Sequence, residues 1–158
     1  MAEQIILSPT RIMSRELPWL IGFFEGEGSV SLTRKITTRN GLYLGVSLSV
    51  GNTVKELLFP FPKRYGGEVY KGRKRSTGRS CSYRWRCPTS SKKRMLSEFI
   101  PHLVSDKKRK CKIALEVLSL TRNGRRFLTE ETKEARGILY RRFYPNGTFR
   151  EKNHSQSN

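Results

Sequence analysis

The sequence predicts an α+β fold, in which an antiparallel sheet carries helices on one of its faces. Two segments show the two-residue alternation of strands around turn signals, whereas the segments beside them show helical spacing. Strands that come in adjacent pairs favour hairpins, and helices between the pairs then cover the apolar face of the sheet. With 158 residues, 35% of them apolar, the chain is predicted to form a single domain over residues 1–158.

The first predicted element is a helix that starts near Pro18, because proline suits the first turn of a helix, where its missing N–H costs little. An apolar stripe at helical spacing runs from Leu17 to Phe24, and Gly28 is the expected C-terminal stop. Residues 1–13 show little pattern and are predicted to be an N-terminal arm.

Two hairpins account for the strands. The first spans residues 29–50 around an Asn40-Gly41 turn signal, and apolar and polar residues alternate on both sides of the turn. The second spans residues 67–87, with its turn near Thr77-Gly78. Each hairpin is therefore expected to have one apolar face and one polar face.

Helical patterns fill most of the remaining chain. The segment 53–67 is predicted to be a short helix broken by Pro60 and Pro62. Three longer helices are predicted at residues 90–100, with Ser90 or Ser91 as its cap, at residues 105–120, and at residues 128–143, with Thr129 as its cap. Residues 145–158 lack an apolar pattern and are predicted to be a disordered tail.

The charge of the chain points to a polyanionic partner. Lysine and arginine number 32 against 13 acidic residues, which gives a net charge of +19. Nucleic acid is the first candidate and an anionic membrane surface the second. No basic amphipathic helix dominates and no apolar run approaches about 18 residues, so a membrane is disfavoured. Three cysteines without a CxxC pair favour an intracellular, reducing compartment over a disulfide framework or a zinc site.

Basic residues concentrate in and around the second hairpin. Between Lys63 and Arg94 there are twelve lysines and arginines, and Glu68 is the single acidic residue. A two-stranded ribbon fits the major groove of DNA, and arginine pairs there with guanine through two hydrogen bonds. A surface that only solubilises the protein usually mixes both signs of charge. The predicted DNA-binding residues are Arg34, Lys35, Arg39, Lys71, Arg73, Arg75, Arg79, Arg84 and Arg86.

Two carboxylates occupy an unfavourable position at the end of the first helix. Glu25 and Glu27 lie near a helix C-terminus, where the helix dipole disfavours negative charge, and their neighbours are glycine or apolar. Salt bridges are one explanation, and a bound Mg²⁺ is the favoured one. Two such sites brought together would place metals about 4 Å apart, as in phosphodiester hydrolysis. Gly22 and Gly26 share a helix face on which a second helix can approach closely.

A second unfavourable charge pattern lies at the start of the helix 105–120, where five cations fall near the positive end of the helix dipole. A bound anion would remove this penalty, and a flexible, solvated lysine run is the plainer alternative. The cations are Lys107, Lys108, Arg109, Lys110 and Lys112.

The stretch from Leu20 to Gly28, LIGFFEGEG, resembles the nine-residue LAGLIDADG motif of homing endonucleases, with identity at Leu20, Gly22 and Gly28. The order of helices and hairpins and the basic charge also agree with that family over most of residues 14–142. The resemblance implies an αββαββα core with a saddle-shaped antiparallel sheet over DNA and extra C-terminal helices. It also implies an organelle or a prokaryotic cytoplasm as the compartment.

The resemblance implies roles for the acidic segment and two other positions. Glu27 matches the metal-binding acid and would hold Mg²⁺, for which Mn²⁺ or non-catalytic Ca²⁺ can substitute, with the Gly26 carbonyl as a further ligand. Asn52 matches a polar residue beside the water and metal pocket, with a helix cap as the plainer reading. Lys107 is preferred over Lys108 as the active-site lysine, and either lysine could instead contact phosphate. Glu25 is left with a structural role.

A single motif implies a homodimer, in which the motif helices of two copies pack together. The predicted interface residues are Leu20, Ile21, Gly22, Phe24 and Gly26. The implied activity is cleavage of both DNA strands at a long pseudo-palindromic site, leaving 3′ overhangs. The alternatives are an intron RNA-splicing maturase, a non-catalytic DNA-binding regulator on the same scaffold, and a basic ribosomal-type RNA-binding protein.

Overall fold

The computed structural model describes residues 9–37, 41–72, 82–120 and 129–146. The elements follow one another as α1 (Pro9–Glu27), β1 (Gly28–Thr37), β2 (Gly41–Asn52), the 3-10 helix η1 (Lys55–Leu58), α2 (Pro60–Tyr65), β3 (Val69–Lys71), β4 (Tyr83–Arg86), the 3-10 helix η2 (Thr89–Ser91), α3 (Lys92–Phe99), α4 (Asp106–Leu120) and α5 (Glu130–Phe143). The predicted α+β class and the αββαββα order with extra C-terminal helices are confirmed.

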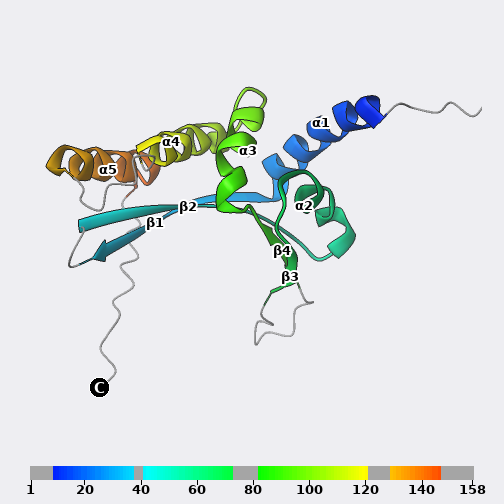
Figure 1. Cartoon of the computed structure of the whole chain (residues 1–158), viewed down its shortest axis with the longest axis horizontal. Coiled ribbons are helices and arrows are strands. Elements are labelled where there is room, and N and C mark those ends of the chain that lie inside the picture. Colours follow the sequence, from blue (N-terminus) through cyan, green and yellow to red (C-terminus); the bar gives the residue numbers. More distant parts are fainter. Residues whose placement is uncertain (1–8, 38–40, 73–81, 121–128, 147–158) are drawn as a thin grey trace, which may run out of the picture.

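The four strands form one antiparallel sheet in the order β1-β2-β4-β3. Gly28 pairs with Val50 across β1 and β2, and Val50 also pairs with Trp85 of β4, so the middle of the sheet ties the two hairpins together. Figure 1 shows α4 and α5 along one side of the β1–β2 ribbon, with β3 and β4 turning away from it. No described element covers the opposite face of that ribbon.

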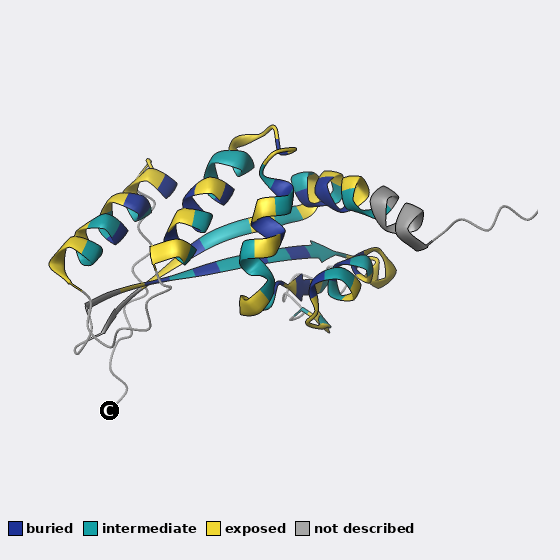
Figure 2. Cartoon of the chain, turned by 45° about the horizontal axis from the view of Figure 1, so that its top comes forward, coloured by how far each residue is buried: buried dark blue, intermediate teal, exposed yellow. Residues whose placement is uncertain are grey.

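The core lies between the helices and the inner face of the sheet. Along β2, Leu44, Val46, Leu48 and Val50 are buried at every second position, which confirms the predicted alternation. Trp85 of β4 is fully buried and continues this face, and aromatic residues from the helices pack against the same core. Figure 2 shows the buried residues on the sides of the elements that face one another, with exposed residues outward.

Two of the predicted helix boundaries are wrong. Helix α1 begins at Pro9 and continues through Pro18, so residues 9–13 of the predicted arm are helical. Proline is favoured in a first helical turn, which is why the sequence pattern placed the start too late. The segment 53–67 is not a helix broken by prolines. It is the short η1 followed by α2, whose first residue is Pro60.

Two predicted caps have different outcomes. Thr129 caps α5, because its hydroxyl accepts a hydrogen bond from the Thr132 N–H at 3.3 Å. Ser91 precedes α3 without a side-chain cap bond, and its hydroxyl donates to the Tyr65 carbonyl at 2.6 Å. Ser91 therefore joins α3 to α2. The predicted turns at Asn40-Gly41 and Thr77-Gly78, and residues 147–158 of the predicted tail, lie outside or partly outside the described residues.

Candidate functional site

The end of α1 passes directly into β1, with Glu27 as the last helical residue and Gly28 as the first residue of the strand. A Cβ at Gly28 would overlap the Phe24 ring and lie 2.5 Å from the Phe24 carbonyl oxygen. Steric contact therefore requires a glycine here. Its backbone conformation does not, because the glycines with positive φ in the described chain are Gly66 and Gly67. The tight junction fixes where Glu27 emerges from the helix.

Helices α1 and α4 cap each other at this junction. The Lys107 ammonium donates to the carbonyl oxygens of Phe24, at 2.8 Å, and of Glu25, at 2.6 Å. In return, the Glu25 carboxylate accepts the Ser105 N–H at 3.0 Å. The Ser105 hydroxyl also accepts from the Lys107 N–H at 3.2 Å. Carbonyls at the end of one helix and amides at the start of the other, both without partners in their own helices, are satisfied by side chains.

These contacts account for the pKa shifts at the junction. Burial opposes ionisation of Glu25, but the side-chain and backbone hydrogen bonds of Ser105, the Val104 backbone and the charge of Lys107 outweigh it and lower the pKa of this carboxyl. Burial lowers the pKa of the Lys107 ammonium, against the opposing influence of Glu25, Cys111 and Glu27. Glu25 therefore has the structural role left open for it, and Lys107 lies in the electrostatic neighbourhood of Glu27.

Glu27 differs from Glu25 in having no internal partner. Its side chain is exposed, and no described residue forms a hydrogen bond or an ion pair with its carboxylate. A free carboxylate beside the last carbonyls of a helix is a donor set that suits a hard divalent cation. Within the described residues no group of three or more His, Cys, Asp or Glu side chains comes together. Glu27 is therefore the residue of this junction whose carboxylate is open to a ligand among the described residues.

Asn52 lies close to Glu27 through the pairing of the strands. Gly28 is opposite Val50, so Glu27 and Asn52 flank the same end of this strand pair. The Asn52 amide oxygen accepts the Val54 N–H at 2.9 Å and closes the turn before η1. The structure thus brings Glu27, Asn52 and Lys107 to one end of the sheet. The Asn52 amide oxygen is already engaged in the hydrogen bond that closes the turn.

The outer face of α1 carries the two glycines. A Cβ at Gly22 or Gly26 would meet no described atom within 4 Å, so no described contact requires glycine at either position. Trp19 lies on the same face, is 41% exposed and stacks on Phe23 with ring centroids 4.9 Å apart. The sequence reasoning missed Trp19, although its spacing of three and seven residues from the glycines could have placed it there.

Three of the predicted interface residues are wrong for that role. Leu20 and Phe24 are fully buried and Ile21 is 8% exposed, all within the core of the same chain. A helix with helical spacing of apolar residues presents that stripe to its own core first, because this burial is available without a partner. Gly22 and Gly26 alone of the five predicted positions face outward.

The open face of the sheet holds some of the predicted DNA-binding residues. Arg84 and Arg86 are exposed on either side of the buried Trp85, which places both on this face. The strand pairing places Arg34 and Lys71 on the other face, so their predicted DNA contacts stay predictions. Arg34 is opposite Leu44, on the inner face, with its guanidinium 5.9 Å from the Tyr140 ring centroid, and Lys71 is opposite the inward Tyr83.

A shift of one residue along a strand exchanges its two faces, and the composition of a charged run does not fix that register. Lys35 is paired with Tyr43, an exposed residue of β2. Four of the predicted DNA-binding residues lie outside the described residues: Arg39, Arg73, Arg75 and Arg79.

Three of the five cations at the start of α4 have partners within the chain. Asp106 pairs with Arg109 at 2.6 Å and with Lys110 at 3.3 Å, while Lys107 turns toward α1. Glu25 supplies a negative charge beside the first turn. The neighbouring helix end and two carboxylates therefore offset part of this charge within the chain, and a bound anion stays a prediction.

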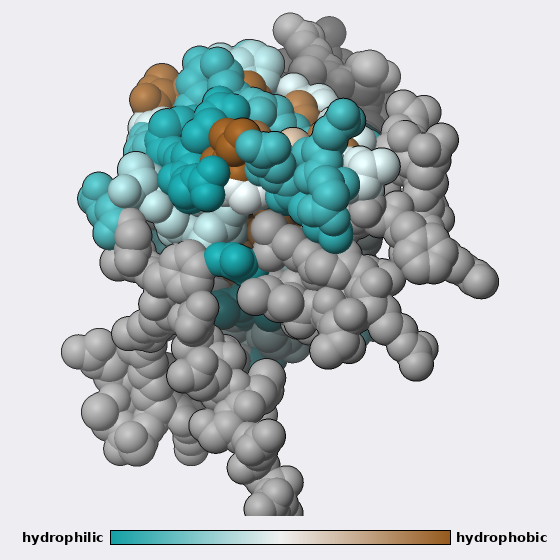
Figure 3. All heavy atoms as spheres, turned by 90° about the vertical axis from the view of Figure 1, so that its left-hand side faces the viewer, coloured by the Kyte–Doolittle hydropathy of each residue, from teal (hydrophilic) through white to brown (hydrophobic). Residues whose placement is uncertain are grey.

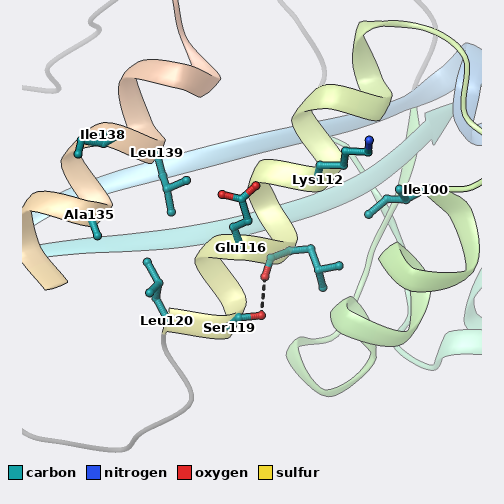
Figure 4. A pocket seen from close by; sticks show the side chains of 9 residues that line it. Ile100, Lys112, Glu116, Ser119, Leu120, Ala135, Ile138 and Leu139 are labelled. Atoms are coloured by element: carbon teal, nitrogen blue, oxygen red, sulfur yellow. Dashed lines mark hydrogen bonds between the residues drawn. The ribbon is translucent and has the colours of Figure 1, made fainter.

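The helix layer has a different surface from the site. Viewed from the α5 side, hydrophilic residues make up most of the described surface, with a few hydrophobic residues between them (Figure 3). An apolar groove of about 740 Å³ separates α4 from α5, with Leu120 and Ile138 on its walls and Lys112 and Glu116 beside it (Figure 4). It contains none of the predicted site residues. No described helix is long and apolar enough to span a membrane.

Solved structures provide the comparison that the sequence does not. No protein-family model matches the sequence, and no curated protein matches it. The archaeal intron-encoded homing endonuclease I-Vdi141I, solved with DNA, is similar with a TM-score of 0.70 at 17% identity, over 92% of this chain and 91% of that one. The homing endonuclease I-CvuI, solved with DNA in the presence of Mg, is similar with a TM-score of 0.64 at 19% identity, over 88% and 86%.

A third similar structure is the LAGLIDADG meganuclease I-AabMI bound to uncleaved DNA, with a TM-score of 0.58 at 17% identity, over 87% of this chain and 53% of that one. The chain therefore has the fold of the LAGLIDADG homing endonucleases, as the resemblance of its nine-residue stretch implied.

Proposed function

We propose that the protein is a site-specific, double-strand DNA homing endonuclease that acts as a homodimer and requires a divalent cation. The observation that carries this proposal is the contrast at the end of α1. Glu27 is exposed and unpaired among the described residues, directly beside a helix face on which Gly22, Gly26 and Trp19 are exposed. The structures of similar fold that were solved with DNA support a DNA partner.

The dimer brings two copies of the outer face of α1 together. Gly22 and Gly26 let the two helix backbones approach closely, and Trp19 adds apolar area at the edge of the contact. Because both helices end at the same junction, the two Glu27 carboxylates meet near the twofold axis. A symmetric dimer would recognise a long, pseudo-palindromic site with its two sheet faces.

The residues of the chain have distinct parts in the proposed reaction. A divalent cation, Mg²⁺ in the first instance, would neutralise charge on the scissile phosphate and activate water. Glu27 of each copy would hold it, with the Gly26 carbonyl as a neighbouring oxygen donor. Lys107 fixes the end of α1 through its two carbonyl contacts and places positive charge near the phosphate. Asn52 would act as a hydrogen-bond donor through its amide nitrogen, because its amide oxygen already accepts the Val54 N–H in the turn. We propose that each cut leaves a 3′ overhang.

The test is selection of cleaved sites from a randomised duplex library with Mg²⁺, for the unaltered protein and for Glu27→Gln. We expect the unaltered protein to yield one pseudo-palindromic site and Glu27→Gln to bind that site with a cleavage rate at least about a thousandfold lower. Mn²⁺ should replace Mg²⁺, whereas Ca²⁺ should support binding alone. Tight binding to a structured intron RNA by both proteins, without any DNA cleavage, would contradict the proposal and favour a maturase.

A further inference from the structure

The open sheet face carries an aromatic residue among its arginines. Tyr70 of β3 is opposite Arg84 of β4, and it is 40% exposed on the outer side of the sheet. Arg86 lies two residues further along β4, on the same face, with its guanidinium carbon 5.9 Å from the Tyr70 ring centroid. Arg86 therefore lies over an aromatic ring, while no described ring or acid contacts the Arg84 guanidinium.

The backbone under these side chains is held from both sides. Trp85, between the two arginines, is fully buried, and its indole N–H donates to the Gly66 carbonyl at 2.9 Å. The Cys87 N–H donates to the Leu48 carbonyl at 2.9 Å and extends the β2–β4 pairing beyond Arg86. Strand β4 therefore holds its outward side chains at fixed positions, and the freedom that remains lies in the side chains themselves.

Stacking distinguishes the two arginines physically. A guanidinium held over an aromatic face at an exposed site is stabilised there about two- to fivefold. An ordered guanidinium loses less conformational freedom when it forms two parallel hydrogen bonds to a guanine edge, and it tolerates misplaced partners less well. Arg84, without a ring contact among the described residues, retains the freedom to adapt to different partners.

We propose that Tyr70 is a specificity-determining residue, which holds Arg86 in the orientation that reads one base pair of the target. This inference rests on the proposed DNA-binding function. The partner is the major-groove edge of double-stranded DNA, and guanine opposite Arg86 is the expected base. Arg84 contributes affinity with weaker base preference.

The experiment is selection of bound sequences from a randomised duplex library, with Glu27→Gln as the parent so that the DNA stays intact. Tyr70→Ala, Tyr70→Phe, Arg86→Lys and Arg84→Lys are compared with it, and the double variants of Tyr70→Ala with each lysine variant complete two cycles. Arg86→Lys should lower discrimination at one base pair about tenfold or more. Tyr70→Ala should lower it at the same base pair about two- to fivefold, and Tyr70→Phe should leave it unchanged.

The cycles separate this role from a purely structural one. Tyr70→Ala should have little further effect once Arg86 is lysine, and its full effect when Arg84 is lysine. A uniform loss of affinity across all sequences after Tyr70→Ala, or equal coupling to both arginines, would overturn the inference while leaving the proposed function intact. If Tyr70→Ala fails to fold, Arg86→Lys provides the test. An unchanged preference at the base pair assigned to Arg86 would then overturn the inference. Selection of no sequence by the parent would overturn the proposed function and the inference together.

Discussion

The two faces of helix α1 differ in how completely the chain satisfies them. On the inner face, Leu20 and Phe24 are fully buried, and one Glu25 carboxylate oxygen accepts the N–H of Ser105, directly before α4. On the outer face, Gly22 and Gly26 meet nothing within 4 Å, and Glu27 has no partner among the described residues. The same short stretch therefore completes the fold on one face and leaves the other face exposed.

The difference teaches how to separate structural from functional residues of the same type. Glu25 and Glu27 are two residues apart, and so are Gly26 and Gly28, yet in each pair one residue has contacts inside the chain and the other is exposed. A residue whose polar groups and volume are accounted for inside the protomer is explained by folding. A residue without such an account is a candidate for function.

The largest expected effect is the loss of protein stability when Gly28, at the junction of α1 and β1, is substituted. Gly28→Ala should lower the free energy of unfolding by about 3 kcal/mol, because the added methyl group overlaps the Phe24 ring and carbonyl. Gly26→Ala is the matched control and should not be destabilised, since a helical glycine with open space around it gains from alanine. Urea unfolding at low protein concentration measures both. Equal stability of the two variants would contradict the steric role of Gly28.

The next effect concerns association through the outer face. Gly22→Leu and Gly26→Leu should each weaken the dimer at least about thirtyfold, the effect of a central interface residue worth about 2 kcal/mol. Each variant should retain the unfolding free energy of the monomer. Sedimentation velocity over a range of concentrations, with and without target DNA, gives the dissociation constant. A leucine variant that dimerises as tightly as the unaltered protein would place the interface elsewhere.

A smaller effect separates the two carboxylates. Glu25→Ala should cost about 1–2 kcal/mol of stability, because it removes a charged acceptor from the Ser105 N–H at the start of α4. Glu27→Ala should change stability by less than about 0.5 kcal/mol, since no described residue depends on it. Thermal unfolding without metal or DNA measures both. The assignment of roles is wrong if Glu27→Ala proves the more destabilising.

The smallest expected effect is the loss of stability when Glu98 is substituted, a carboxylate outside α1 that forms structural hydrogen bonds. Glu98 of α3 accepts from the Tyr65 hydroxyl at 2.6 Å and from Arg64 and Arg94 at 3.2 Å. Glu98→Gln should cost about 1 kcal/mol, as expected for partly exposed charged hydrogen bonds. Burial opposes ionisation of Glu98, but these hydrogen bonds outweigh it and lower its pKa below the usual 4.5.

The sign of this shift fixes the pH dependence. A carboxylate with a lowered pKa in the folded state stabilises the protein above the pKa of the unfolded chain, and this contribution is lost as the pH falls. The difference between Glu98→Gln and the unaltered protein should therefore be constant near neutral pH and shrink below about pH 4.5. Unfolding measured from pH 7 to pH 3 shows it, and a difference that grows toward acid pH would contradict the assigned contacts.

The apolar–polar alternation of the first hairpin and the apolar stripe of α1 were enough to predict most of the fold from the sequence. The buried positions of β2, the cap at Thr129 and the end of α1 at Gly28 all follow from local patterns. Errors occurred where a local signal has two outcomes. Proline begins α2 at Pro60 but lies inside α1 at Pro18, and no short pattern separates these cases.

The site was predicted in its residue types and only partly in its arrangement. The acidic helix end and the lysine at the start of α4 were found from the motif and its context, and the structure brings Lys107 to the α1 carbonyls. Arg34 and Lys71 were assigned to the wrong face, because a one-residue step in a strand reverses the direction of a side chain. The stacking of Arg86 on Tyr70 joins two strands, and no spacing along one strand reveals it.

The sequence by itself determined the class of fold, the basic surface and the acid at the end of a glycine-bearing helix, since each is written in local periodicity or composition. Only the tertiary structure decided which carboxylate is free. Glu25 and Glu27 look equivalent in the chain, and the approach of Ser105 and Lys107, 80 and more residues away, binds one and leaves the other exposed. The physical reason is that hydrogen bonds between helix ends depend on packing, and packing of distant segments is not encoded in the spacing of either segment alone.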